Sequence, residues 1–415
     1  MEKLIIQNFL VIKEAKFDVG KVNVIIGPQA NGKSILVKLL YFFRETISER
    51  LLQSIENNET KQQFLKNIEE LFEKYFPKYT WKDKEFNIEY IFHGFILKIS
   101  KQPTQRTIKV EICEEVNSMF KKLKNEYKKF LLKEKEKEEE WELDSFFEFK
   151  YKHIYHNEDR SKYFTESLFI PASRSFFANL QKNIFSFLAT NIDIDPFMSK
   201  FGSKYEMSKK IYSDRGYFQS RLEDDENFAK VQKIVTSIIN GNYRYRDDQD
   251  WIEKNGESIN LSNASSGQQE SLPMLLILSI FPFINRKGSD NIFFIEEPEA
   301  HLFPISQKHI VSLIGLIYNM KQNSVITTHS PYILTAINNL LLAYDVMTEH
   351  GEKSIKKIID KEFCINFNDV KAYTIKNGKL ISIMNKEERL IGINIIDSVS
   401  NEFNDTFDKL LALQI

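Results

Sequence analysis

Short apolar runs separated by polar segments are the main pattern along this 415-residue chain. Val22–Ile26, Ile292–Ile295 and Val325–Thr328 are three such runs, and charged residues, glycine or proline follow each one closely. Continuous apolar or β-branched runs of about four to eight residues are typical of buried strands. We therefore interpret them as strands and predict an α/β fold.

Other segments alternate or repeat with helical spacing. Phe86–Glu111 alternates between apolar and polar residues, which predicts strands of a small antiparallel sheet. Lys121–Glu140 is dense in charge, yet Phe120, Leu123, Tyr127, Phe130 and Leu131 keep helical spacing. We predict a long amphipathic helix there with a solvated face, and whether that face has a partner stays open.

Three parts follow from this pattern. Residues 1–112 are expected to form a first lobe, residues 113–250 a mainly helical insertion, and residues 251–415 a second lobe. A second helical stretch is predicted from about Ser175 to Asn240. Its aromatic residues belong either to the core or to an oligomer contact: Phe176, Phe177, Phe185 and Phe187.

The segment GPQANGKS, Gly27–Ser34, satisfies G-x-x-x-x-G-K-[ST], the phosphate-binding loop (P-loop) of P-loop NTPases. It follows a predicted strand and opens a stretch with helical spacing at Ile35, Leu36, Leu39, Leu40 and Phe43. Loop amides and the helix N-terminus would face phosphates, Lys33 would neutralise their charge, and Ser34 would hold Mg²⁺. The candidate nucleotide-binding residues here are Gly27, Pro28, Asn31, Gly32, Lys33, Ser34 and Ile35.

Paired acids end the second apolar run, in the segment NIFFIEEPEAHLFP (Asn291–Pro304). A buried strand that ends in acids is the Walker B arrangement of P-loop NTPases. We assign Glu296 to Mg²⁺ and Glu297 to polarising the water that attacks the γ-phosphate. Strand alternation is expected to send the two side chains to opposite faces.

Two further segments complete a family pattern. NASSGQQES (Asn263–Ser271) precedes an apolar run, and SVITTHSPYIL places His329 at the end of the third predicted strand. The whole set resembles ABC-type ATPases of the SMC, RecF and OLD group, and EEPEAHLFP with TTHSPY is closest in wording to the OLD-like branch. The N-terminal strands, the region from about Asn260 onward and the short marker Phe169–Arg174 carry this resemblance. Glu296 replaces the Asp of most ABC proteins, and no glutamine can be assigned to the Q-loop.

The resemblance implies a fold of the ABC/SMC-head type and the hydrolysis of ATP with Mg²⁺. It aligns Ser265, Ser266, Gly267 and Gln268, here called the signature segment, with the ABC signature, and His329 with the switch histidine. In such ATPases the signature of one protomer caps the ATP on the P-loop of another. The chain holds one copy of each motif, so a homodimer or a higher oligomer is the smallest competent unit. Arg174 would either reach nucleotide or anchor a loop.

The resemblance also bears on partners. OLD nucleases carry a C-terminal TOPRIM domain, whereas residues 350–415 read as a closing β-hairpin and a helix from about Asn394. We therefore expect an OLD-like ATPase that controls a separately encoded nuclease or toxin in anti-phage defence, as in PARIS-type and Septu-type systems, with DNA or a phage-derived molecule as trigger. The alternative is a DNA-binding repair ATPase of RecF or SMC type, and a transporter subunit is disfavoured.

Composition narrows the picture further. Lys+Arg 57 against Asp+Glu 58 gives a net charge of -1, so overall charge does not favour nucleic-acid binding. Two cysteines, Cys113 and Cys364, fit a reducing compartment rather than a disulfide or zinc framework. No apolar run reaches the roughly 18 residues of a membrane span, so we expect a cytoplasmic protein without membrane contact.

Overall fold

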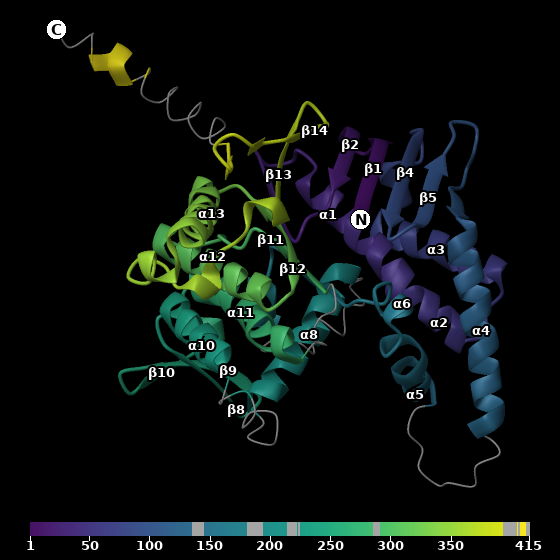
Figure 1. Ribbon diagram of the computed structural model, residues 1–415, viewed down its shortest axis with the longest axis horizontal. Helices are drawn as coiled ribbons and strands as arrows, with labels where there is room; N and C mark the ends of the chain where they lie inside the picture. Colours follow the sequence, from purple (N-terminus) through teal and green to yellow (C-terminus); the bar gives the residue numbers. More distant parts are fainter. Residues whose placement is uncertain are drawn as a thin grey trace.

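The computed structural model describes residues 1–134, 145–180, 194–213, 222, 225–284, 291–392, 405 and 407–411. Within these residues, the strands of one 11-stranded sheet run in the order β6-β5-β4-β1-β2-β14-β13-β3-β12-β11-β7. The sheet passes through the whole molecule, with helices packed along it (Figure 1). The prediction of an α/β fold is confirmed.

One half of the sheet is parallel. Its strands are β7 (Ser167–Ile170), β11 (Ile292–Glu296), β12 (Asn323–Thr328), β3 (Val22–Ile26) and β13 (Val370–Lys376). Registers such as Phe294 opposite Val325 and Ile326 opposite Val24 align these strands, so that their carboxyl ends meet at one edge. The three apolar runs of the sequence are β3, β11 and β12, as predicted.

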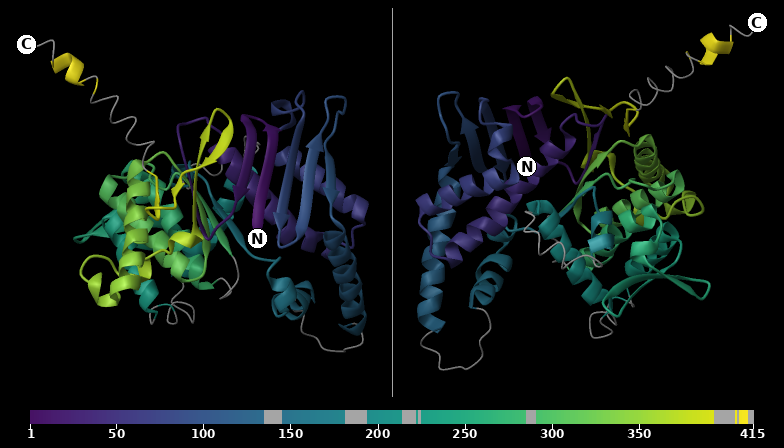
Figure 2. Two further views of the ribbon diagram at one scale, coloured as in Figure 1. Left: turned by 45° about the horizontal axis from the view of Figure 1, so that its top comes forward. Right: turned by 180° about the vertical axis from the view of Figure 1, so that it is seen from behind.

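Helices cover both faces of this half, which explains why its strands are apolar throughout. Alternate residues of each strand enter two different cores: Phe294 and Val325 face α1, whereas Phe293 and Ile326 face α11, α12 and α13. In Figure 2, right, the purple helices that follow the P-loop lie across one face of the sheet. The helices of the two layers are α1 (Lys33–Glu45), the π-helix η1 (Thr46–Arg50), α2 (Leu51–Glu56), α3 (Lys61–Tyr75), α8 (Pro196–Ser213), α10 (Glu226–Ile239), α11 (Ser266–Ile284), α12 (Pro304–Asn319) and α13 (Pro331–His350).

The other half is antiparallel, and in its strands β4 and β5 buried residues alternate with half-exposed ones. Its strands are β1 (Glu2–Phe9), β2 (Ile12–Asp18), β4 (Phe86–Phe92), β5 (Phe95–Lys101) and β6 (Lys109–Ile112). The alternation predicted for Phe86–Glu111 is confirmed. The strands do not form a small separate sheet, however, because β4 pairs with β1 and continues into the parallel half.

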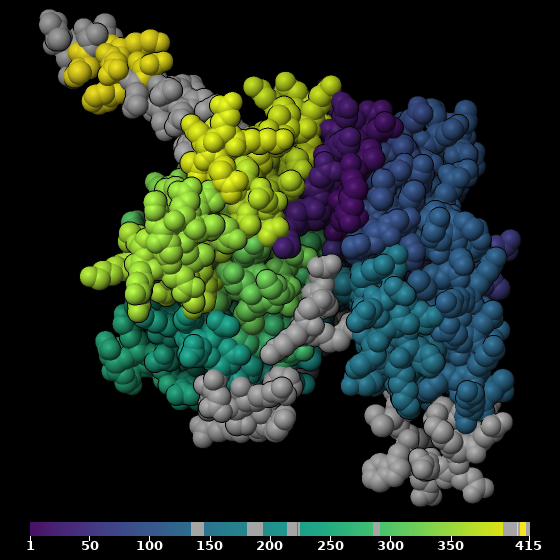
Figure 3. Space-filling view, in the orientation of Figure 1, coloured from purple at the N-terminus to yellow at the C-terminus, as the bar shows by residue number. Residues whose placement is uncertain are grey.

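A C-terminal hairpin joins the halves. Its strands are β13 and β14 (Lys379–Ser382), and β14 meets β2 through the single pair Lys379 and Glu14. The Gly378 carbonyl accepts hydrogen bonds from the Lys13 amide at 2.8 Å and the Glu14 amide at 3.2 Å. Figure 3 shows the yellow hairpin against the purple N-terminal strands on the surface. The predicted closing hairpin is confirmed, and its strand β14 lies beside β2 near the start of the sequence.

The range expected to be a mainly helical insertion is more mixed. It contains β7, which pairs in parallel with β11, so part of this range belongs to the central sheet. The predicted amphipathic helix is α4 (Glu114–Glu134); it begins earlier than expected, and residues 135–140 lie outside the described residues. Phe185, Phe187 and most of the predicted C-terminal helix also lie outside them. The remaining elements are η2 (Lys78–Thr80), α5 (Ser145–Lys150), η3 (Tyr151–Tyr155), α6 (Glu158–Ser161), β8 (Asn242–Arg246), β9 (Gln249–Lys254), β10 (Glu257–Asn260), η4 (Leu261–Asn263), η5 (Glu352–Ser354), η6 (Lys361–Phe363), η7 (Phe367–Asp369), β15 (Met384–Asn385) and β16 (Leu390–Ile391).

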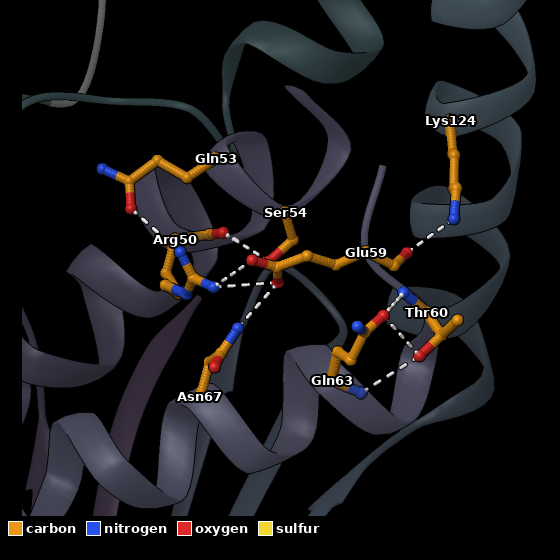
Figure 4. Close-up of polar contacts among 8 residues, drawn as sticks. All are labelled: Arg50, Gln53, Ser54, Glu59, Thr60, Gln63, Asn67 and Lys124. Carbon is orange, nitrogen blue, oxygen red and sulfur yellow. Dashed lines mark hydrogen bonds and ion pairs between the residues drawn. The ribbon is translucent and has the colours of Figure 1, made fainter. Parts of the chain in front are cut away.

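Polar contacts secure the turn between α2 and α3 (Figure 4). Arg50 donates two hydrogen bonds to Glu59 at 2.7 and 2.8 Å, and Lys124 of α4 donates to the Glu59 carbonyl at 2.6 Å. Thr60 and Gln63 form a capping box that starts α3. These contacts fix α4 against the helices that continue from the P-loop.

No helix among the described residues is long and apolar enough to cross a membrane.

Candidate functional site

The P-loop lies between the end of β3 and the start of α1, as the sequence predicts. Its backbone takes left-handed conformations at Ala30 (φ 61°) and Gly32 (φ 94°). A Cβ on Gly32 would lie 2.9 Å from Val11 in the β1–β2 turn, so only glycine fits there. No side chain caps α1 at Gly32, which leaves the amides of its first turn for an anion.

Lys33 crosses the mouth of this loop. Its Nζ donates to the carbonyls of Gly27 and Pro28, both at 2.7 Å, and lies 3.5 Å from Nδ1 of His329. Burial lowers the pKa of Lys33, and the carboxylates of Glu297 and Glu299 oppose that effect. Because its two hydrogen-bond acceptors are neutral carbonyls, the ammonium can turn to a phosphate without breaking an ion pair.

Glu296 ends β11 and is buried. Burial raises the pKa of Glu296, while Lys38, the Ser34 hydroxyl and the Ala172 amide lower it. Its Oε1 has no hydrogen-bond partner within the described part of the chain. A hydroxyl and a carboxylate with an unused oxygen are ligands that Mg²⁺ prefers, so Ser34 and Glu296 fit the ion that the sequence assigns to them.

Glu297 lies outside the strand, with φ 44°, and its amide donates to the Thr327 carbonyl at 2.9 Å. Its side chain is 37% exposed, and its Oε1 lies 3.1 Å from Nε2 of His329. The two acids therefore differ in burial, and the strand alternation invoked for them does not apply. A left-handed turn directs Glu297 towards β12, whereas strand alternation would require both residues to be in the strand.

Glu299 is a site residue that the sequence analysis missed. Its Oε1 accepts hydrogen bonds from the Thr328 hydroxyl at 2.8 Å and the His329 amide at 2.7 Å. It thereby ties the loop after β11 to the end of β12 and places His329 between Lys33 and Glu297. The second acid of the E-P-E sequence was the available signal.

The signature segment lies at the start of α11. The Ser265 hydroxyl and amide donate to Oε1 of Gln268, and Nε2 of Gln268 donates to the Ile239 carbonyl at 2.7 Å. A Cβ on Gly267 would lie 2.8 Å from the His301 carbonyl. Ser265 and Ser266 are exposed. No hydrogen bond or ion pair joins this segment to the P-loop within the described residues, so the structure does not bring it to Lys33 of its own chain.

The sequence left two roles open for Arg174, contact with nucleotide and anchoring of a loop, and the structure supports the second. Its buried guanidinium donates to the main-chain carbonyls of Pro171, Glu270, Glu296 and Glu297 at 2.7 to 3.0 Å. Pro171 belongs to the marker itself, but Glu270, Glu296 and Glu297 lie about a hundred residues further along the sequence, so the marker alone does not indicate them.

A model of the AAA ATPase domain matches residues 1–334. Among solved structures, the chain is similar to an SMC head bound to the C-winged helix domain of ScpA, with 12% identity, 93% of this chain and 98% of that chain covered, and a TM-score of 0.43. It is similar to the SMC head of Thermotoga maritima with 11% identity, coverage of 92% and 97%, and a TM-score of 0.37. For the recombination mediator protein RecF the identity is 12%, the coverage 92% and 97%, and the TM-score 0.33. A search of curated proteins gives no match.

Proposed function

The chain belongs to the family of AAA ATPase domains, and from this premise we propose that it hydrolyses ATP to ADP and phosphate. One observation carries the proposal. The structure places Nζ of Lys33, from α1, 3.5 Å from one ring nitrogen of His329 at the end of β12, and Oε1 of Glu297, from the turn after β11, 3.1 Å from the other. These groups come from three separate motifs and meet beside an uncapped helix N-terminus, where a phosphate chain is stabilised.

Each residue has a role in this proposal. The P-loop amides and Lys33 hold the β- and γ-phosphates, and Ser34 and Glu296 hold Mg²⁺. When bound, that ion neutralises charge that develops on the phosphoryl oxygens. Glu297 accepts a proton from the attacking water, and Nε2 of His329, 3.1 Å from Glu297, orients this carboxylate and contacts the γ-phosphate region.

We further propose that the site is completed by a second copy of the chain. Ser265 and Ser266 are exposed at the start of α11, and the N-terminus of a helix favours an anion. Within the described residues neither serine forms a hydrogen bond or ion pair with Lys33, Glu297 or His329 of its own chain, so the signature segment of a partner would cap the ATP. A homodimer then contains two composite sites.

The use of the ATPase cycle is the most specific part of the proposal. We propose that an OLD-like ATPase of this form restrains or activates a separately encoded nuclease or toxin in anti-phage defence, and that DNA or a phage-derived molecule triggers it. The support is the wording of two motifs, EEPEAHLFP and TTHSPY, which resembles that of OLD-like ATPases.

The purified chain tests the chemistry. We expect Mg²⁺-dependent ATP hydrolysis that Glu297→Gln abolishes, and no cleavage of DNA or RNA with Mg²⁺ or Mn²⁺. Metal-dependent nucleic-acid cleavage that survives Glu297→Gln would contradict control through a separate effector. Stimulation of hydrolysis by DNA alone would favour the RecF- or SMC-like alternative.

Cells carrying the gene test the biological role. They are challenged with phage when they contain this gene alone, the gene beside it in its genome alone, or both, because a separately encoded effector is expected to be encoded nearby. We expect protection only with both genes, and its loss in Lys33→Ala. Robust protection by this gene alone would overturn the partner hypothesis.

A further inference from the structure

Arg174 connects two parts of one chain, the turn that carries Glu297 and the start of α11. In the proposed dimer these two parts act on different ATP molecules. Its Nη1 donates to the Glu296 carbonyl at 2.7 Å and its Nη2 to the Glu297 carbonyl at 3.0 Å. Its Nε donates to the Glu270 carbonyl at 2.9 Å, in the first turns of α11. A single planar group therefore holds both the turn that carries Glu297 and the helix that begins with the signature segment.

Glu270 completes the connection from the other side. Its carboxylate accepts the amide of Arg174 at 3.0 Å and that of Ser175 at 2.8 Å, and lies 3.3 Å from Nε of Arg174. Glu270 lies two residues after Gln268, and its side chain is 4% exposed against 0% for Arg174. The two side chains thus cross-link three segments: Pro171–Ser175, the start of α11 and the end of β11.

The energetics favour a positioning role. Burying an ion pair costs desolvation that its attraction seldom exceeds by much, so such a pair is weak evidence for stability. Here main-chain carbonyls also offset the desolvation free energy of the guanidinium, because each of its interactions described above is with Glu270 or with a carbonyl. Displacing α11 would leave buried donors unpaired, and moving the Glu296–Glu297 turn would do the same.

We propose that Arg174 and Glu270 form a clamp that couples the start of α11 to the position of Glu297 within one chain. The proposal rests on the composite ATP site proposed above. ATP held by the partner contacts the signature segment, α11 shifts, and the clamp carries that shift to Glu297, which acts on the other ATP. Neither clamp residue touches nucleotide, so both are positioning residues.

Arg174→Lys is the first test, because lysine keeps the charge but cannot hold several carbonyls in one plane. Glu270→Gln is the second, since it keeps the shape and one acceptor. The matched control is Arg160→Lys, because Arg160 is also buried, pairs with Glu126 at 2.7 and 2.8 Å, and donates to the His153 carbonyl far along the chain from the site.

The clamp itself is measured without nucleotide, by hydrogen exchange. We expect faster exchange at the Glu297 amide and across residues 296–302 in both clamp variants, and unchanged exchange there in Arg160→Lys. Unchanged exchange in Arg174→Lys would overturn the clamp, whether or not the chain is an ATPase. This readout therefore separates failure of the clamp from failure of the proposed function.

Coupling is measured by steady-state hydrolysis. In Arg174→Lys we expect kcat to fall about 10- to 100-fold, as for loss of a group that preorganises the transition state, with KM for ATP within about twofold. A rise in KM at unchanged kcat, or an equal loss in Arg160→Lys, would overturn the coupling.

Mixed dimers locate the effect. Arg174→Lys is placed either in the protomer opposite Lys33→Ala or in the same protomer as Lys33→Ala. In the first arrangement, the chain with the intact P-loop also carries the altered clamp. In the second, the chain with the intact P-loop is otherwise unaltered and faces the signature segment of a chain whose clamp is altered. We expect activity below that of dimers carrying Lys33→Ala alone in the first arrangement only, because there the altered clamp lies in the chain whose Glu297 acts on the bound ATP; an equal loss in the second arrangement would contradict transmission through the clamp.

Discussion

The parallel and antiparallel halves of the sheet differ in whether their buried side-chain oxygens have hydrogen-bond partners. In the antiparallel half, Arg44 donates to both oxygens of Glu2 at 2.7 Å, and Tyr90 donates to the same carboxylate at 2.6 Å. In the parallel half, buried oxygens on Ser167, Glu296, Ser324 and Thr327 have no partner, whereas none on the antiparallel strands lacks one within the described residues.

This difference indicates that one half contributes mainly to the stability of the fold and the other mainly to ligand binding. A fully satisfied buried network stabilises one arrangement, while unpaired buried groups cost free energy unless something binds them. Glu296 and Thr327 lie at the carboxyl ends of β11 and β12, beside the P-loop. The antiparallel half is therefore expected to hold the fold, and the parallel half to hold the ligand.

The largest expected effect comes from the parallel half. Glu297→Gln removes the proposed base and keeps the shape of the turn, so we expect ATP hydrolysis to fall by roughly two to three orders of magnitude with ATP binding retained. Lys33→Ala should lose tight ATP binding itself. Single-turnover hydrolysis and equilibrium binding of labelled ATP measure the two quantities.

Melting temperature serves as the control for both variants, because their side chains are not part of the antiparallel core. Near-normal turnover in Glu297→Gln would remove it as the base and direct attention to Glu296 or His329.

The second prediction concerns the exposed start of α11. Gly267→Arg would block the docking of a partner's ATP, but a Cβ there already meets the His301 carbonyl at 2.8 Å, so the fold would shift as well. Ser266→Arg avoids this clash because Ser266 is exposed. We expect loss of about 90% or more of hydrolysis, as when a transition-state contact is removed.

Mixing Ser266→Arg with Lys33→Ala should restore part of the activity, since a mixed dimer keeps one intact composite site. If mixed dimers form and no activity returns, the sites are complete within single chains.

The third prediction tests the buried polar network of the antiparallel half. Glu2→Gln removes the carboxylate that accepts two hydrogen bonds from the buried Arg44, so we expect a loss of about 3–5 kcal/mol in unfolding free energy, as when one partner of a buried ion pair is removed. Chemical denaturation measures it. Asp18→Asn is the matched control, because the Lys3–Asp18 pair joins β1 to β2 in the same half, Asp18 is exposed, and the pair is expected to contribute about 1 kcal/mol or less.

Replacing the network by apolar groups, as in Glu2→Leu with Arg44→Met and Tyr90→Phe, should recover much of the lost stability. If Glu2→Gln is no worse than Asp18→Asn, the antiparallel half does not depend on this network.

The smallest effect compares the two cysteines. Cys113 follows β6 and is half-buried, whereas Cys364 is buried against Ala343 and Ile355 beside α13. Burial raises the pKa of the Cys364 thiol to about 11, so at pH 8.5 it stays protonated, and the thiolate is the reactive form. We expect iodoacetamide to label Cys113 about tenfold faster or more, as measured by mass spectrometry of peptides. Equal rates in the folded protein would show that the layer beside α13 opens readily.

The sequence predicted each half by its own period. Continuous apolar runs predicted β3, β11 and β12, which are buried on both faces, and alternation predicted β4 and β5, which are buried on one face. Both patterns depend only on residues that are close in the sequence. Spacing does not specify which strands pair, so neither β7 at the edge nor the joining of the halves by β14 could be predicted. The clamp of Arg174 and Glu270 was hidden for the same reason, since its contacts span about a hundred residues or more of sequence.

The hairpin that joins the halves has a consequence for how the protein is made. The Asn31 side chain in the P-loop donates to the Ile375 carbonyl of β13, which lies between β3 and β14 in the sheet. A ribosome therefore delivers Lys33 more than three hundred residues before it delivers the strand that flanks the P-loop. During that interval β3 lacks its neighbour, and such long-range pairing is intrinsically slow. We therefore expect the P-loop to reach its final conformation only after β13 has been translated.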